Sequence, residues 1–322
     1  MSSNSIIDGN ATISRNEMTN LTRSTPPTRE RNAIWYTTVI LLVIIIILAT
    51  AGNLMVLAAM RIERGLRERY FIGCLAVADL LIGVFFCPLR LYEYEVGITS
   101  LHLCRFYMWI NIFLASASIY TLTWISCDRY LKISKPLRYN VIMTQKKSKI
   151  VISIIWMIST AYATNGSFDM YVSPYGCSND NDLFYTVSMI IAFFVPTAIA
   201  LIMYTRILLV ANRRRKRARR GELGKTSQFT NHPSSFYKDL KNIRMMAIVI
   251  GAFVLCWGPF FIMNFFYRHN QALIKTFKNE QSHNLTAFIL PPFNSVCNPI
   301  IYACFDKRFR VAFKRLFTRL WR

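Results

Sequence analysis

Seven long, apolar stretches with few or no charged residues constrain this chain more than any other feature. They are Ala33 to Met60, Tyr70 to Leu89, Phe106 to Cys127, Ile150 to Phe168, Leu183 to Thr205, Met245 to Tyr267 and Asn284 to Phe305. Each has roughly the twenty residues that an α-helix needs to cross the hydrocarbon core of a bilayer. The sequence therefore predicts an all-α membrane protein, a bundle of seven transmembrane helices.

The charge balance predicts how the bundle lies in the membrane. The 322 residues are 53% hydrophobic, yet they carry a net charge of +23, so the charge must lie in the loops. Most of the 39 lysines and arginines follow the first, third, fifth and seventh stretches. By the positive-inside rule these segments are cytoplasmic, and the N-terminus is outside. Residues 1–27 lack the apolar core of a signal peptide, so we expect the first helix to act as the targeting signal.

Glycosylation sequons and cysteines agree with this orientation. Asn10 and Asn20 begin sequons in the outer tail, and two further sequons, at Asn165 and Asn284, lie close to the membrane on the same side. Cys104 and Cys177 both lie at the oxidising outer face, so we expect a disulfide between them. The other six cysteines fall in or at the ends of apolar stretches, where packed thiols are expected.

Three polar motifs at the ends or in the middle of the stretches carry more information. The third stretch ends in Asp128-Arg129-Tyr130, and an arginine at the membrane edge is costly unless it is paired or functional. The sixth contains Trp257-Gly258-Pro259, and the seventh contains Asn298-Pro299-Ile300-Ile301-Tyr302. Together these motifs resemble those of rhodopsin-like (class A) G-protein-coupled receptors, from about Trp35 to Phe317. The resemblance is strongest to receptors for biogenic amines.

The resemblance implies a conformational mechanism. Arg129 would pair in the resting state with Asp239, which lies twenty residues before Pro259, or about 30 Å along a helix. Outward movement of the sixth helix would break that pair and admit a Gα subunit of a heterotrimeric G protein. The alternative is that Asp239 is solvated and contributes little to stability. The residues that the resemblance assigns to activation and coupling are Asp128, Arg129, Tyr130, Pro136, Leu137, Tyr204, Asp239, Pro259, Pro299 and Tyr302.

Asp79 is the only acidic residue of the second stretch and lies near its middle, where an ionised carboxylate needs partners. The resemblance implies a sodium site there, and oxygen ligands suit a hard cation. The rival is a protonated Asp79 in a hydrogen-bonded network. The residues expected in the sodium site or network are Asp79, Ser118, Asn294, Ser295, Asn53 and Asn298. No other cofactor is expected.

The ligand site departs from the amine receptors at two positions. Asn111 replaces the aspartate that pairs with an ammonium group, and an amide supplies no counter-charge. Pro292 replaces a supporting tyrosine. An amine-like small molecule is favoured by the overall pattern, and a peptide or a neutral small molecule is the alternative. The expected ligand contacts, carried over by position, are Asn111, Ala115, Ser188, Trp257, Phe260, Phe261, Asn264 and Phe288.

The chain divides into three parts. Residues 1–34 form an outer glycosylated tail, 35–305 the seven-helix domain with a basic inner loop at 212–238, and 306–322 an amphipathic helix on the membrane surface. The basic loop suits anionic lipid better than nucleic acid, which is not an expected partner. Thr318 is the only phosphorylatable residue after Tyr302, so the sequence leaves open whether a phosphorylated tail recruits arrestin. The inner loop contains other candidate phosphorylation sites.

Other functional classes fit less well. A retinal protein would need a lysine between Asn284 and Phe305, and there is none. An ion-coupled transporter would show repeats or several intramembrane charges, whereas Asp79 stands alone in mid-span. No enzyme is expected, because the spans contain no nucleophile and base pair. We expect a multi-pass receptor of the plasma membrane.

Overall fold

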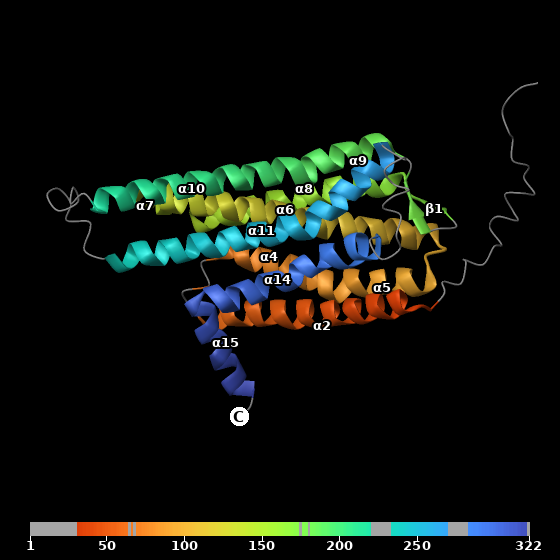
Figure 1. Cartoon of the computed structure of the whole chain (residues 1–322), viewed down its shortest axis with the longest axis horizontal. Helices are drawn as coiled ribbons and strands as arrows, with labels where there is room; N and C mark the ends of the chain where they lie inside the picture. The colour runs from red at the N-terminus through yellow and green to blue at the C-terminus, as the bar shows by residue number, and fades with distance from the viewer. Residues whose placement is uncertain are drawn as a thin grey trace, which may run out of the picture.

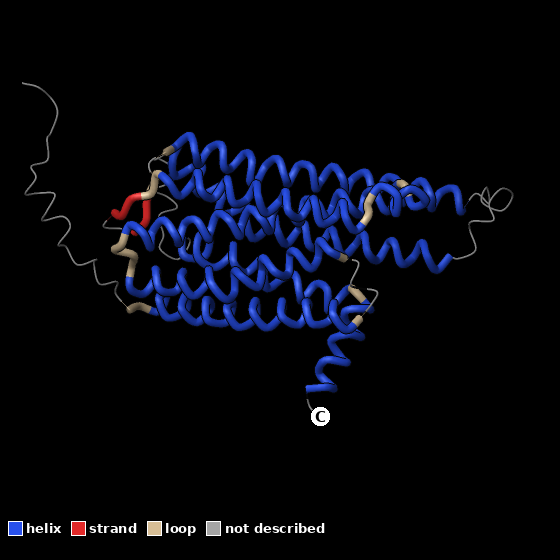
Figure 2. Tube along the Cα trace, turned by 180° about the vertical axis from the view of Figure 1, so that it is seen from behind, coloured by secondary structure: helices blue, strands red, loops and turns tan. Residues whose placement is uncertain are grey.

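The computed structural model describes residues 31–63, 66, 69–173, 176–179, 181–219, 233–269 and 283–320, which are almost wholly helical (Figures 1 and 2). Seven helices or runs of helices are long and apolar enough to cross a membrane, so the predicted fold is confirmed. They are α2 (Ala33–Ile62); α4 (Tyr70–Leu81), η1 (Ile82–Phe86) and α5 (Cys87–Val96); α6 (Leu101–Ser134); α8 (Gln145–Phe168); α9 (Asp182–Ser188), η2 (Met189–Phe194) and α10 (Val195–Arg219); α11 (Pro233–His269); and η4 (Asn284–Ile289) with α14 (Leu290–Phe305). Two short helices, α7 (Pro136–Ile142) and α15 (Lys307–Leu320), are also among the described elements.

Polar side chains begin several helices by accepting bonds from the free N–H groups of the first turn. The side-chain oxygen of Asn32 accepts from the backbone N–H of Trp35 at 2.9 Å at the start of α2. Asn181 does the same for Phe184 at 2.9 Å and so begins α9. At the other end of a span, Gly97 takes a φ of 79° after α5, a conformation that favours glycine. Local sequence thus sets these helix ends.

Within the described residues, three membrane helices contain one wide turn each, with π-helical hydrogen bonding. These turns are η1, η2 and η4, and each is followed two residues later by a proline: Pro88, Pro196 or Pro291. Proline cannot donate to the preceding turn and its ring crowds the carbonyl there, so the backbone widens before it. The wide turns therefore have a local cause in the sequence.

The helix α6 lies in the interior of the bundle, against α4, α8 and α10 (Figure 1). Its long apolar stretch is mostly buried, whereas many large side chains of the outer helices are exposed, such as Ile47, Met157 and Leu255. Exposed apolar side chains on membrane-length helices are what lipid contact requires. The polar side chains are instead turned inward, Asp79 and Asn53 among them.

A two-stranded hairpin covers one end of the bundle, which we call the hairpin end (Figures 1 and 2). Its strands, β1 (Tyr171–Ser173) and β2 (Gly176–Ser178), are antiparallel, with Val172 opposite Cys177. Cys177 forms a disulfide with Cys104 on α6, which confirms the predicted bridge, and their Cα atoms are 5.6 Å apart. The disulfide holds the hairpin against the third membrane helix.

The other end, which we call the α15 end, contains a contact that refines the predicted amphipathic helix. Helix α14 ends at Phe305, Asp306 is extended, and α15 leaves the bundle at a large angle (Figure 1). The carboxylate of Asp306 is buried and pairs with Arg69. Phe309 stacks on Tyr302 with 5.2 Å between ring centroids, and Phe313 is buried too. Much of the predicted apolar face is therefore packed on the bundle.

Two groups of predicted features lie outside the described residues or side chains. Asn10 and Asn20 lie before the first described residue, and the side chains of Asp239 and Pro136 lie outside the described part of the structure. Asn284 is buried and its side-chain nitrogen donates to the hydroxyl of Tyr94 at 2.9 Å, which leaves no room for a glycan at that sequon.

Gly166 allows α8 to approach α9 closely, and we predict that a side chain there is destabilising. An added Cβ would lie 2.3 Å from Cζ of Phe184 and 2.8 Å from Cδ1 of Ile112. Overpacking of this kind costs about 1–3 kcal/mol, so Gly166→Ala should lower the midpoint of thermal unfolding of the purified protein. A second change, Phe184→Leu, should restore much of the loss because it removes the ring that is struck.

Gly251→Ala is the matched control. A Cβ there meets nothing within 4 Å, and alanine favours a helix over glycine by about 1 kcal/mol. The control should therefore unfold no earlier than the wild type when followed by tryptophan fluorescence. A Gly166→Ala protein as stable as the wild type would contradict the close contact.

Candidate functional site

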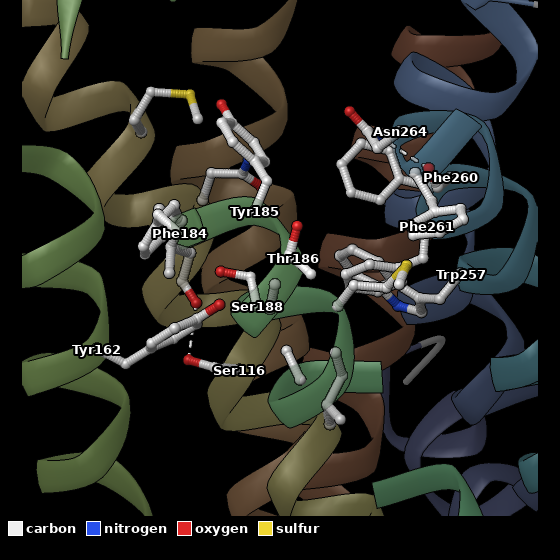
Figure 3. Close-up of a pocket in the computed structure, with 18 of the residues that line it drawn as sticks. Ser116, Tyr162, Phe184, Tyr185, Thr186, Ser188, Trp257, Phe260, Phe261 and Asn264 are labelled. Atoms are coloured by element: carbon white, nitrogen blue, oxygen red, sulfur yellow. Dashed lines mark hydrogen bonds between the residues drawn. The ribbon is translucent and has the colours of Figure 1, made fainter. Parts of the chain in front are cut away.

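A pocket opens near the hairpin end between α6, α8, the α9–η2 segment and α11 (Figure 3). It encloses about 820 Å³ of space, its open mouth included. The lining residues are Met108, Asn111, Ile112, Ala115, Ser116, Ile119, Tyr162, Phe184, Tyr185, Thr186, Ser188, Met189, Ala192, Trp257, Phe260, Phe261, Asn264, Phe265 and His269. A mixture of apolar walls with a few polar groups is typical of small-molecule sites.

The structure brings together most of the residues predicted to contact a ligand. Those that line the pocket are Asn111, Ala115, Ser188, Trp257, Phe260, Phe261 and Asn264. The eighth, Phe288, does not line it. Its ring lies on η4, with its centroid 4.4 Å from the guanidinium carbon of Arg90 and 5.2 Å from the centroid of Tyr94.

One wall of the pocket is aromatic. Trp257, Phe260 and Phe261 come from two successive turns of α11 and pack against one another, with centroid distances of 5.3–5.9 Å. Phe193 of η2 stacks on Phe261 at 4.9 Å, which joins the fifth and sixth membrane helices. The indole N–H of Trp257 is buried and has no hydrogen-bond partner among the described residues. This wall can therefore offer both ring faces and one free donor.

The facing wall carries hydroxyl groups. Tyr162 of α8, Ser116 of α6 and Ser188 of α9 present their oxygens to the same side of the pocket (Figure 3). At the mouth, the Thr186 hydroxyl lies 3.1 Å from Nε2 of His269, which connects α9 to α11. Hydroxyl groups can both donate and accept, so this wall can bind a polar group without carrying a charge.

Among the residues that line this pocket there is no carboxylate, lysine or arginine. Asn111, the position at which an acidic residue would provide a counter-charge, offers only an amide. Rings, hydroxyl groups and amides can hold a planar ligand by stacking and hydrogen bonding. The pocket therefore has the chemistry of a site for neutral groups.

Sequence reasoning missed several lining residues. Tyr162, Phe184, Thr186 and His269 were not expected at the pocket. Phe184 could have been found, because it lies four residues before Ser188 and so on the same helical face. The others depend on how far the ends of α8, α9 and α11 extend toward the hairpin, which periodicity does not reveal.

A buried polar cluster lies deeper in the bundle, around Asp79. Its carboxylate accepts from Nδ2 of Asn298 at 2.7 Å and from the hydroxyls of Ser295 at 2.9 Å and Ser118 at 3.5 Å. These bonds join α4 to α6 and α14. Asn53 was expected beside Asp79, but its Nδ2 donates instead to the carbonyls of Ala49 and Ser295. It thereby ties α2 to α14.

The oxygen atoms of this cluster fit a hard cation. The hydroxyls of Ser118 and Ser295 both bond to the carboxylate of Asp79, so the three groups lie together. Asn294, the residue before Ser295, is also buried. The side-chain oxygen of Asn53 is buried without a hydrogen-bond partner among the described residues. Hydroxyl, amide and carboxylate oxygens are the ligands that hard cations prefer.

Near the α15 end, Arg129 lies near the end of α6 with its side chain 14% exposed. Its Nε lies 3.8 Å from the carboxylate of Asp128, whose other oxygen accepts from the hydroxyl of Tyr139 at 2.8 Å. Tyr130 packs against Ile207 of the neighbouring helix α10, and so does Tyr204 of α10 itself. The predicted Arg129–Asp239 pair cannot be located, because the side chain of Asp239 lies outside the described part of the chain.

The remaining predicted residues also lie toward this end or in the helix interiors. Tyr302 is buried against Phe309, and Leu137 is exposed on α7. Pro259 and Pro299 lie inside α11 and α14. Proline in a membrane helix frees a backbone carbonyl and favours a bend.

Similarity to known proteins agrees with this architecture. Residues 52–302 match the family described as "7 transmembrane receptor (rhodopsin family)". The D(1)-like dopamine receptor of Takifugu rubripes is 30% identical over 82% of this chain and 66% of its own length. The histamine H2 receptor of Rattus norvegicus is 30% identical over 84% of this chain and 76% of its own.

A relative with a different kind of ligand in its name is about equally similar. The adenosine receptor A2b of Gallus gallus is 28% identical over 85% of this chain and 86% of its own length. Some relatives are much longer, and the chain spans 54% of the human alpha-1D adrenergic receptor. The match runs from Gly52, past the middle of the first membrane helix, to Tyr302, near the end of the seventh. The chain belongs to the rhodopsin family of seven-transmembrane receptors.

Proposed function

We propose that the protein is a plasma-membrane receptor that passes the binding of a small extracellular ligand to a heterotrimeric G protein. The observation that carries the proposal is that one helix, α6, contains both Asn111 at the pocket and Arg129 at the opposite end. At 1.5 Å per residue the two are about 27 Å apart along that helix. Membership of a receptor family supports the same assignment.

The pocket also contacts the helix that would move. Trp257, Phe260 and Phe261 lie immediately around Pro259 in α11. A ligand shifts a conformational equilibrium only if it binds one arrangement better than the other. Contacts on both sides of the proline would change with the bend of α11, so they can supply that difference. Movement of its far end away from Arg129 would then open the surface for Gα.

The ligand class that we propose is a small aromatic molecule held by stacking and hydrogen bonds. The uncharged pocket supports this, and so does the adenosine receptor among the relatives, because adenosine is a neutral aromatic nucleoside. An amine is the second candidate, supported by the dopamine and histamine receptors among the relatives. A peptide is the remaining alternative.

The proposed orientation places the hairpin end outside and the α15 end in the cytoplasm. Oxidising conditions favour the Cys104–Cys177 disulfide at the outer face, and glycosylation at Asn10 and Asn20 belongs to the same side. The basic residues of α15, such as Lys314, would meet anionic lipid. Arrestin stays an open partner.

The first prediction of the proposed function concerns Arg129. In cell membranes that contain the receptor, Arg129→Ala should reduce nucleotide exchange on added purified heterotrimeric G protein at least tenfold, because a partly buried cation at the proposed Gα surface is lost. Arg310→Ala, which removes an exposed arginine on α15, should keep the wild-type rate at matched surface expression. An Arg129→Ala rate equal to the wild type would contradict the proposal, as would substrate flux that depends on Asp79.

The second prediction separates the two ligand classes. Asn111→Asp should create a response to dopamine or histamine only if the pocket otherwise fits an amine. A charge-assisted bond contributes about 1.5–3 kcal/mol, which corresponds to roughly tenfold to a hundredfold in affinity. Asn111→Ala is the matched control, since it removes the amide without adding charge. If the wild type already responds to an amine and Asn111→Asp does not strengthen that response, the proposal of an uncharged pocket is contradicted.

The third prediction concerns sodium, which would be held by Asp79 with the hydroxyls of Ser118 and Ser295. Sodium chloride should raise the midpoint of thermal unfolding above that in potassium chloride at equal ionic strength, because a ligand that binds only the folded state stabilises it. Asp79→Asn should remove the difference, and Asp169→Asn, an exposed carboxylate at the hairpin end, should keep it. No sodium effect in the wild type would favour a protonated Asp79.

A further inference from the structure

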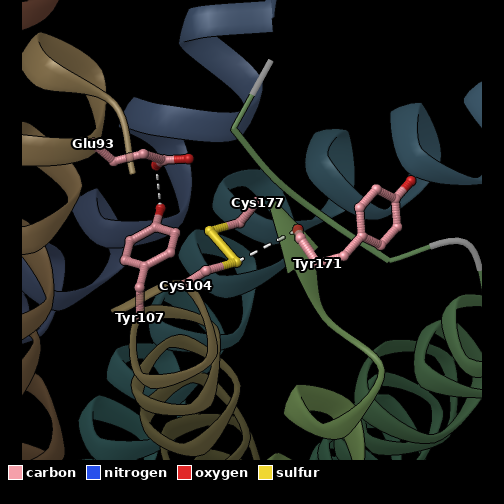
Figure 4. Close-up of a disulfide and its surroundings, with 5 residues drawn as sticks. All are labelled: Glu93, Cys104, Tyr107, Tyr171 and Cys177. Carbon is pink, nitrogen blue, oxygen red and sulfur yellow. Dashed lines mark hydrogen bonds between the residues drawn. A yellow bond between two sulfur atoms is a disulfide. The ribbon is translucent and has the colours of Figure 1, made fainter. Parts of the chain in front are cut away.

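Near the hairpin end, a buried arginine joins three membrane helices next to the pocket. Arg90 of α5 is 8% exposed, and its Nη1 donates to the hydroxyl of Tyr107 on α6 at 2.7 Å. Its Nη2 donates to the backbone carbonyl of Ala287 on η4. The Tyr107 hydroxyl in turn donates to the carboxylate of Glu93 (Figure 4). Arg90 and Glu93, one turn apart, thus meet through Tyr107.

Aromatic rings enclose the guanidinium group. Its carbon lies 4.4 Å from the ring centroid of Phe288 and 5.4 Å from that of Phe86. Phe86 stacks on Tyr107 at 5.8 Å, and Tyr94 packs edge-on against Phe288. Cation–π contacts of this kind strengthen when water is excluded. The group therefore fills the space between the second, third and seventh membrane helices.

This cluster borders the pocket but contributes nothing to its lining. Tyr107 lies one helical turn before Asn111 on α6, and Asn111 lines the pocket. All lining residues come from α6, α8, α9, η2 and α11, and none comes from α5 or η4. The pocket therefore ends where the Arg90 cluster begins.

A ligand could not easily displace this cluster. Displacement would take from the guanidinium its two acceptors, the Tyr107 hydroxyl and the Ala287 carbonyl, and a buried cation without partners is strongly unfavourable. It would also leave the Glu93 carboxylate without a nearby cation. A neutral ligand offers no equivalent partner for these groups.

We propose that Arg90, held by Tyr107, Ala287 and Phe288, is a specificity-determining residue that closes the bundle between the second, third and seventh helices and confines ligands to the pocket. The proposal rests on the proposed function, because it concerns where a ligand fits. It also explains the position of Phe288, which covers the guanidinium instead of lining the pocket.

A native thiol allows the closure to be measured without a ligand. Cys87 lies one turn before Arg90, is fully buried and belongs to the same apolar cluster as Phe86 and Tyr107. Labelling with the membrane-impermeant reagent trimethylammonioethyl methanethiosulfonate on intact cells, read by mass spectrometry, should be slow in the wild type. Arg90→Ala should label Cys87 at least tenfold faster, and Arg90→Ala with Cys87→Ala should return to background.

Two further variants and one control thiol distinguish a local loss of the closure at Arg90 from a general loosening of the helix bundle. Phe288→Ala uncovers the guanidinium and should also accelerate labelling of Cys87, which keeps the proposal testable if Arg90→Ala fails to reach the surface. Tyr107→Phe keeps the ring but removes the bridging hydroxyl, and should give an intermediate rate. Cys74, buried in the other half of the second helix, should stay unlabelled throughout.

Fast labelling of Cys87 in the wild type would overturn the proposal. So would unchanged labelling in the variants that reach the surface, or a parallel rise at Cys74. The measurement uses neither a ligand nor a G protein, so its failure is distinct from a failure to signal.

Discussion

The burial of Asp79 is the constraint on which the arrangement of the bundle depends. Hydrocarbon offers no hydrogen-bond partners, so a carboxylate in mid-membrane must find them on neighbouring helices. Asn298, Ser295 and Ser118 supply them, and this joins the second helix to the third and the seventh. Asn53 adds the first helix through the Ser295 carbonyl. One polar centre therefore sets the relative positions of four helices.

Much of this could be predicted from the sequence because the signals are local or strongly directional. Length and hydropathy identified the seven spans, and the oxidising face identified the Cys104–Cys177 bridge. The Arg90 cluster could not be predicted in the same way. The helical spacing of Arg90 and Glu93, one turn apart, favours a direct pair, whereas the hydroxyl of Tyr107 on another helix lies between them. Such a contact depends on the rotation of three helices at once.

The candidate site shows the same division. Positions carried over along α6, α9 and α11 fell at the pocket, and all of them lie in α-helical segments. Phe288 did not, and it lies in the wide turn η4, where the residues per turn differ from those of an α-helix. Its direction is set by Arg90 and Tyr94, which no spacing rule connects to it.

The three wide turns have a consequence for how such helices can change in length. Each turn holds one residue more than an α-helical turn, inside the membrane rather than in a loop. Loss of that residue from η1 would convert it to an ordinary α-helical turn, and the part of the helix beyond it, including Arg90, would keep its face. The same loss from a regular α-helical part of a span would rotate everything beyond it by about 100°. In this fold, the wide turns are therefore places within a span where the chain can lose one residue without turning half a helix away from its neighbours.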